Sequence, residues 1–77
     1  MNSDISVILK NKRKSLGLRQ SDIAKAVGKS LVFIQKLEQG KINPPIRIVQ
    51  DIANAYDIDA EIIVEKLIKR LKTLAKQ

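Results

Sequence analysis

The sequence predicts an all-α fold of five helices, with no segment that favours a β-strand. Two observations support this class. Apolar residues recur at spacings of three and four, the period of a helix with one buried face. The three glycines, Gly17, Gly28 and Gly40, fall where these patterns stop, and glycine readily adopts the left-handed conformation that ends a helix. With no internal repeat or flexible linker, the chain is expected to form one small domain.

The first helix is expected over residues 4–16, with Ser3 or Asp4 as its N-cap. Its inward-facing positions are Ile5, Ile8, Leu9 and the stem of Lys12. The second helix is expected over residues 20–27, with an apolar stripe of Ile23, Ala24 and Val27. Ser30 stands where its hydroxyl would cap a third helix, expected over residues 31–39, whose inward stripe is Ile34 and Leu37. Two helices joined by so short a turn form a helix-turn-helix.

A fourth helix is expected over residues 46–56, after a rigid link at Asn43, Pro44 and Pro45, because proline disfavours helical conformation in the residue before it. Its apolar stripe is Ile48, Val49, Ile52, Ala53 and Tyr56.

The fifth helix, expected from residue 59 to about 75, has two apolar faces. One face is expected to dock on the first and fourth helices and consists of Ile58, Ile62, Ile63 and Ile68. The other is a heptad-like seam of Ala60, Val64, Leu67, Leu71 and Leu74. A lone domain of this size has one core, so the second face predicts a homodimer, with Val64, Leu67, Leu71 and Leu74 at the interface. The chain would thus divide into a domain over residues 1–59 and a dimerisation helix over residues 60–77.

Composition excludes several function classes. The chain has no cysteine or histidine, which removes disulfides, thiolate metal sites and the usual general base. We therefore expect no enzyme, no metal and no cofactor. The sequence has no signal peptide and no apolar run long enough to cross a membrane, so we expect a cytoplasmic protein without a membrane partner. The net charge is +7, and residues 1–41 alone carry +6, as expected of a surface that binds phosphate. A basic amphipathic fifth helix lying on nucleic acid or a membrane is an alternative.

Five short motifs in fixed order resemble the Cro and phage-repressor type of helix-turn-helix, the XRE-like family. They are R-x-x-x-G-L-x-Q at 13–20, I-A-x-x-V-G at 23–28, S-x-x-x-I-x-x-L-E-x-G-K at 30–41, N-P-P at 43–45 and an apolar pattern ending in I-A at 48–53. The resemblance covers about residues 9–59 and implies a repressor-like fold. It also implies double-stranded DNA as the partner, with the third helix in the major groove, the docking geometry for which repressors of this family are standard examples.

The resemblance implies phosphate contacts from Gln20 and from the nearby basic residues Arg19, Lys29 and Lys41. It places base reading on the start of the third helix, at Ser30, Leu31, Val32, Phe33, Gln35 and Lys36. Many relatives carry polar residues at the first of these positions, whereas Leu31 and Val32 cannot hydrogen-bond a base edge. The Leu-Val-Phe run could instead bind a protein, and Phe33 could be buried.

Two polar residues are implied as structural partners. Arg13 and Glu38 would form a partly buried ion pair that locks the third helix to the first, although Arg13 could instead contact phosphate. Gln20 would also brace the third helix.

The prediction is a sequence-specific transcriptional regulator that acts as a dimeric repressor on a palindromic operator. Two alternatives remain at this point. One is an antitoxin that binds its own operator and a toxin. The other is a helical protein-interaction module that does not bind DNA.

Overall fold

Residues 4–75, the part of the chain that the computed structural model describes, contain five α-helices and no strand; side-chain surroundings are described for residues 4–72. The helices are α1 (Ile5–Ser15), α2 (Gln20–Val27), α3 (Leu31–Glu38), α4 (Val49–Tyr56) and α5 (Ala60–Ala75). A short 3-10 turn, η1 (Ile46–Ile48), leads into α4. The predicted all-α class is confirmed.

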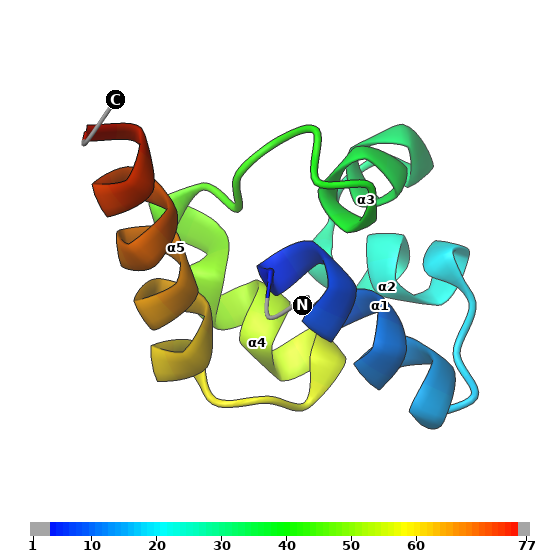
Figure 1. Cartoon of the computed structure of the whole chain (residues 1–77). Helices are drawn as coiled ribbons and strands as arrows, with labels where there is room; N and C mark the ends of the chain where they lie inside the picture. Colours follow the sequence, from blue (N-terminus) through cyan, green and yellow to red (C-terminus); the bar gives the residue numbers. More distant parts are fainter. Residues whose placement is uncertain (1–3, 76–77) are drawn as a thin grey trace.

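Helix α4 lies at the centre of the arrangement, in contact with α1, α2 and α5 (Figure 1). Helix α3 packs on α2 and α1 at one side of the molecule, and α5 packs on α4 and α1 at the other. The long loop after α3 returns the chain across the molecule to α4. Helix α3 is therefore a peripheral element whose outward surface α4 and α5 do not cover.

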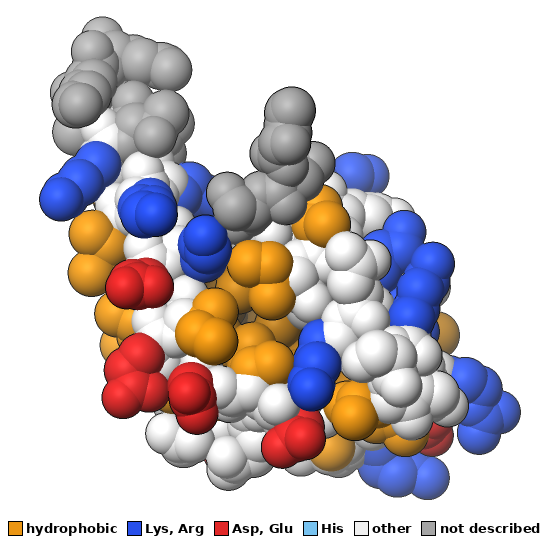
Figure 2. All heavy atoms as spheres, turned by 60° about the horizontal axis from the view of Figure 1, so that its bottom comes forward, with side chains coloured by type: hydrophobic (Ala, Val, Ile, Leu, Met, Phe, Trp, Pro, Cys, Tyr) orange, Lys and Arg blue, Asp and Glu red, His pale blue; other side chains and the backbone are white. Residues whose placement is uncertain are grey.

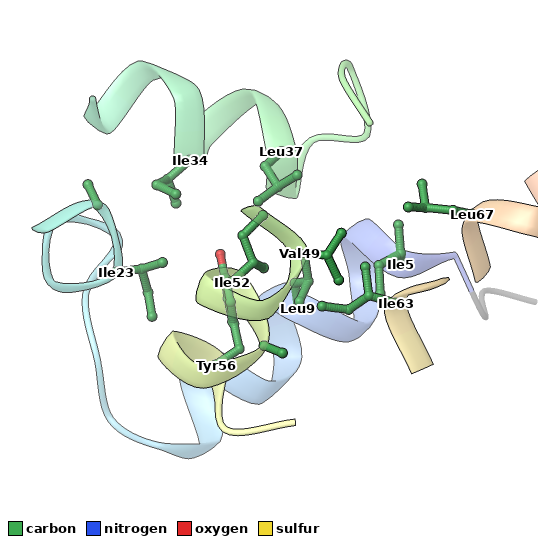
Figure 3. Packing of buried hydrophobic residues seen from close by; sticks show 12 residues of the cluster. Ile5, Leu9, Ile23, Ile34, Leu37, Val49, Ile52, Tyr56, Ile63 and Leu67 are labelled. Atoms are coloured by element: carbon green, nitrogen blue, oxygen red, sulfur yellow. The ribbon is translucent and has the colours of Figure 1, made fainter. Parts of the chain in front are cut away.

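All five helices contribute to one hydrophobic core (Figure 3). Its buried members are Ile5, Leu9, Ile23, Ala24, Ile34, Leu37, Val49, Ile52, Ala53, Tyr56, Ile63 and Leu67. Burying a large aliphatic side chain contributes roughly 1.5–3 kcal/mol, so this cluster is the main source of stability. It also fixes the angle between α2 and α3, because both helices anchor in it.

The turn between α2 and α3 is set by two local features. Gly28 has a φ of 78°, and its N–H donates to the carbonyl of Ala24 at 2.9 Å, which ends α2. The Ser30 hydroxyl then accepts a hydrogen bond from the N–H of Phe33 at 3.1 Å, which caps α3 as the sequence predicted. These features account for the short and rigid connection of the helix-turn-helix.

The fourth helix begins differently from the prediction. The chain leaves Pro45 in an extended conformation and makes the 3-10 turn before regular α-helix starts at Val49. Ile48 has a φ of −115° and a ψ of 13°, which interrupts the helix between the two parts. The predicted apolar stripe nevertheless faces inward, with Val49, Ile52, Ala53 and Tyr56 buried.

The two apolar faces of α5 differ from those predicted. Leu67, assigned to the dimer seam, is only 7% exposed and lies in the core one turn after Ile63. Ile68 and Ile62, assigned to the docking face, are 47% and 37% exposed. Both assignments were wrong. Adjacent positions on a helix point about 100° apart, so when Leu67 faces α4 and α1, Ile68 points away from them.

Arg70 ties α5 to two distant segments. Its guanidinium donates hydrogen bonds to Asn43, in the loop after α3, and to Asp4, the N-cap residue of α1. Asp4 also accepts a bond from the Ser6 hydroxyl at 2.7 Å. Partial burial raises the pKa of Asp4, but the bonds from Arg70 and Ser6 outweigh this effect and leave its pKa below the ordinary value.

Candidate nucleic-acid interface

Helix α3 has one buried half and one exposed half. Ile34, Leu37 and Glu38 are buried against the other helices. Leu31, Val32 and Lys36 are exposed, and Phe33 and Gln35 are half-buried. Leu31 and Val32 lie in the first turn of α3 and Lys36 one turn later, all within the segment where the sequence predicted base reading. The structure therefore presents these residues together on one outward surface.

The carboxylate of Glu38, at the end of α3, accepts hydrogen bonds from three other helices. Arg13 of α1 donates through Nε at 2.8 Å to Oε2 and through Nη2 at 2.9 Å to Oε1. Gln20 of α2 donates its amide at 3.1 Å, and Tyr56 of α4 donates its hydroxyl at 2.7 Å. We call these four side chains the Glu38 cluster. The implied ion pair between Arg13 and Glu38 is present, and so is the implied brace from Gln20.

The pKa shifts in the Glu38 cluster follow from these contacts. Burial raises the pKa of Glu38, but bonds from Arg13, Tyr56 and Gln20 outweigh burial and hold its pKa below the ordinary value. The bond to Glu38 raises the pKa of Arg13. Burial raises the pKa of Tyr56, and its bond to the Glu38 carboxylate raises it further. The cluster thus holds an ionised carboxylate with a charged Arg and a neutral Tyr at neutral pH.

The Glu38 cluster fixes the position of α3. Arg13 also donates to the carbonyl of Leu18 at 2.9 Å, which holds the turn between α1 and α2. A buried carboxylate that loses one partner is costly, so α3 cannot rotate without breaking several bonds at once. Sequence reasoning treated Tyr56 only as part of an apolar stripe and missed its hydroxyl. The sequence did hold a signal for this bond: Tyr56 lies on a predicted buried face, and a buried tyrosine hydroxyl is nearly always hydrogen-bonded.

The predicted phosphate contacts lie around the ends of α2 and α3. The side chain of Arg19 is 83% exposed, and its guanidinium lies 3.6 Å from Asp22. The Asp22 carboxylate accepts the Arg19 backbone N–H at 2.8 Å, and this bond lowers the pKa of Asp22. Lys29 and Lys41 are both exposed. Gln20 is half-buried because its amide is bonded to Glu38.

Phe33 is half-buried between the core and the surface. Its side chain packs against the core, and the Lys29 ammonium lies 5.9 Å from the ring centroid. A cation at this distance is attracted by the ring. Of the predicted base-reading residues, Leu31, Val32 and Lys36 are the exposed ones on α3, with Ser30 exposed at its cap.

The opposite side of the molecule has a different charge pattern. Figure 2 views the side away from α3, where acidic side chains gather over the start of α5 and the turn before it. Basic side chains lie toward the end of α5 and along the far edge, and apolar side chains occupy the middle. Residues 42–59 carry a net charge of −2, in contrast to +6 on residues 1–41. The positive charge is therefore concentrated on the segment that contains α2 and α3, which suits this segment to a polyanion.

Residues 9–63 match the helix-turn-helix family. The chain belongs to this family. The match begins within α1, includes α2, α3 and α4, and ends early in α5, so it contains all four members of the Glu38 cluster. The XRE-like resemblance is thereby confirmed.

Two curated proteins are similar to this chain. The HTH-type transcriptional regulator DdrOP3 of Deinococcus deserti is 35% identical over 57 residues, covering 74% of this chain and 44% of that protein. The ImmF control region 10 kDa protein of Bacillus phage phi105 is 29% identical over 59 residues, covering 77% of this chain and 66% of that protein. The chain thus spans less than two thirds of either relative.

Two further findings concern the described residues alone. None of their helices is long and apolar enough to cross a membrane. Among the same residues, no group of three or more acidic, cysteine or histidine side chains is placed to hold a metal ion.

Proposed function

We propose that this helix-turn-helix protein binds double-stranded DNA sequence-specifically and regulates transcription as a repressor. The observation that carries the proposal is the division of α3. Its inward face, with Ile34, Leu37 and Glu38, is buried and held by the Glu38 cluster, while Leu31, Val32 and Lys36 on its outward face are exposed. A helix held in this way fits the major groove and presents its first residues to base edges. The regulatory role is further supported by the printed names of the two relatives, a transcriptional regulator and a phage control-region protein.

The base-reading residues would act by different chemistries. Gln35 would pair with adenine through its amide, and Lys36 would donate to guanine or to a phosphate. Arg19, Lys29 and Lys41 would contact phosphates, which position the protein without reading sequence. Gln20 would contribute in two ways, because one hydrogen of its amide NH2 is donated to Glu38 and the other can be donated to a phosphate.

Salt dependence tests the DNA-binding proposal. Each phosphate neutralised by a cation contributes a slope of about −0.9 in log affinity against log salt concentration. Three cations on each protomer therefore predict a slope of about −5 for a dimer. Affinity for a selected operator, measured by fluorescence anisotropy across a range of salt, would show this slope. A slope near zero would refute DNA binding and favour the interaction-module alternative.

We also infer that the protein acts as a dimer joined through α5. The support is an exposed apolar stripe along this helix, formed by Val64, Ile68 and Leu71. The stripe borders a shallow apolar hollow lined by Ala60, Glu61, Val64, Glu65 and Ile68. Val64 and Leu71 belong to the predicted seam, Ile68 takes the place of Leu67, and the Leu74 side chain lies outside the described residues.

Charge favours an antiparallel pairing of the two α5 helices. Glu61 and Glu65 lie in the first half of the helix, and Lys72 lies near its end. A twofold axis perpendicular to the helices would set Glu61 of one copy beside Lys72 of the other. The same operation would bring Leu71 of each copy toward the hollow of its mate, and a twofold interface must be self-complementary in this way. Such a dimer would bind a near-palindromic operator, with half-sites about 34 Å apart.

Sedimentation equilibrium at tens of micromolar tests the dimer. Ile68→Asp would place a charge in the proposed interface and should yield monomers, whereas Ser21→Asp, an exposed change on α2, should not. Lys72→Glu should weaken the dimer, and adding Glu61→Lys should restore it if the pairing is antiparallel. A monomeric parent protein would refute the dimer, and a failure of the reversed pair to recover would refute the antiparallel arrangement.

A further inference from the structure

We infer that the protein recognises thymine methyl groups in its operator through Leu31 and Val32. This inference rests on the proposed function and specifies what the first turn of α3 reads. The two side chains are 44% and 55% exposed and lie next to each other at the tip of α3. Neither has a polar atom, so neither can hydrogen-bond a base edge. In the major groove, the C5-methyl of thymine is the base-edge group that an aliphatic side chain can contact.

The surroundings of this apolar tip favour DNA over a protein as the partner. Ser30 is exposed beside it, and the exposed lysines Lys29 and Lys36 lie on either side of it in sequence. The cap bond from the Phe33 N–H uses the Ser30 oxygen as acceptor and leaves the hydroxyl hydrogen to donate to a phosphate. Apolar side chains flanked by two ammonium groups and a hydroxyl suit a groove lined by methyl groups and bordered by phosphates.

The position of Gln35 sets where the thymine would lie. Gln35 is four residues after Leu31 and three after Val32, so the three side chains share one face of α3. One helical turn advances 5.4 Å, and one base-pair step along B-DNA is about 3.4 Å. The methyl contact is therefore expected one or two base pairs from the adenine read by Gln35. The operator half-site would contain A·T pairs at both positions.

The size of the effect follows from the loss of one methyl group. Removing one buried methyl-sized group weakens affinity about fourfold, the equivalent of ~0.8 kcal/mol. In a palindromic operator the loss would occur in both half-sites and would amount to about fifteenfold.

The experiment replaces thymine by deoxyuridine, one position at a time, in an operator selected from random DNA. Uracil keeps every hydrogen-bonding group of thymine and lacks only the methyl. At one or two positions per half-site, affinity of the parent protein should fall about fourfold. Val32→Ala and Leu31→Ala proteins should bind the thymine operator more weakly and lose the uracil effect at those positions. Lys36→Ala is the matched control, because it removes a neighbouring polar side chain and should retain the uracil effect.

The outcomes separate this inference from the proposed function. If no motif emerges from the selection and binding does not depend on salt, DNA binding itself is wrong. If a motif emerges but no uracil position matters, or if the two alanine variants bind every duplex as the parent does, methyl recognition is overturned and DNA binding stands. Because both side chains are exposed, the variants should unfold at the temperature of the parent, which excludes misfolding as the cause of weaker binding.

Discussion

Replacing Tyr56 by Phe tests how much the Glu38 cluster stabilises the domain. Tyr56 is fully buried, and its ring lies in the core with the hydroxyl at the end nearer α3 (Figure 3). The substitution keeps the ring and removes one hydrogen bond, donated at 2.7 Å to an ionised carboxylate. Glu38 keeps its bonds from Arg13 and Gln20, so the change isolates one donor.

The expected loss follows from the charge on the acceptor. Hydrogen bonds to charged groups contribute roughly 1.5–3 kcal/mol, about twice the value for neutral pairs. A domain of this size shifts its melting temperature by about 4–8 °C per kcal/mol. Tyr56→Phe should therefore lower the free energy of unfolding by about 1.5–3 kcal/mol and the melting temperature by roughly 6–24 °C.

Urea unfolding followed by circular dichroism measures this loss. An unchanged slope of the free energy of unfolding against urea concentration indicates that only stability has changed. Adding Glu38→Gln to both proteins completes a double-mutant cycle, in which the tyrosine should matter less once the carboxylate charge is gone. If Tyr56→Phe costs less than about 0.5 kcal/mol, or costs the same in both backgrounds, the hydroxyl is not a significant part of the cluster.

Three further outcomes are expected. First, the pKa of Glu38 in the folded protein lies below its ordinary value of 4.5, so the stability that its ionised form contributes is complete above that pH and is lost as the pH falls below it. Glu38→Gln should therefore make the urea midpoint depend less on pH in this acid range. Second, Gln35→Ala and Lys36→Ala should change the motif selected from random DNA, since a bidentate base contact gives roughly 1–3 kcal/mol of discrimination; an unchanged motif and affinity would refute this reading surface. Third, Lys41→Ala should weaken all duplexes alike and make the salt slope less steep by about 1 per protomer; a sequence-dependent effect would argue against a phosphate contact.

Much of the fold was predictable because helix ends and turns depend on residues that are close together in the sequence. The bounds of α2 agree with the prediction, and Gly28 and Ser30 set the following turn through their own backbone and side-chain chemistry. The Arg13–Glu38 pair came from family resemblance, since 25 residues separate the partners and spacing alone does not bring them together.

The errors arose where a choice depended on three-dimensional packing. The apolar residues of α5 form a broad arc rather than a narrow stripe, so its sequence does not say which part of that arc meets α4 and α1. Leu67 and Ile68 were therefore exchanged between the two faces. The hydroxyl of Tyr56 was overlooked for a similar reason, because its partner Glu38 is 18 residues away on another helix.

The division of α3 into fixed and exposed positions has a consequence for how operator preference can change. Ile34, Leu37 and Glu38 are buried and hold the helix in the domain, whereas Leu31, Val32 and Lys36 are exposed. Exposed substitutions usually change stability by no more than about 0.5 kcal/mol. The outward positions form an exchangeable set that can be replaced without redesigning the domain beneath it. Variants with new operators can therefore arise, or be selected in the laboratory, by a few substitutions on an unchanged scaffold.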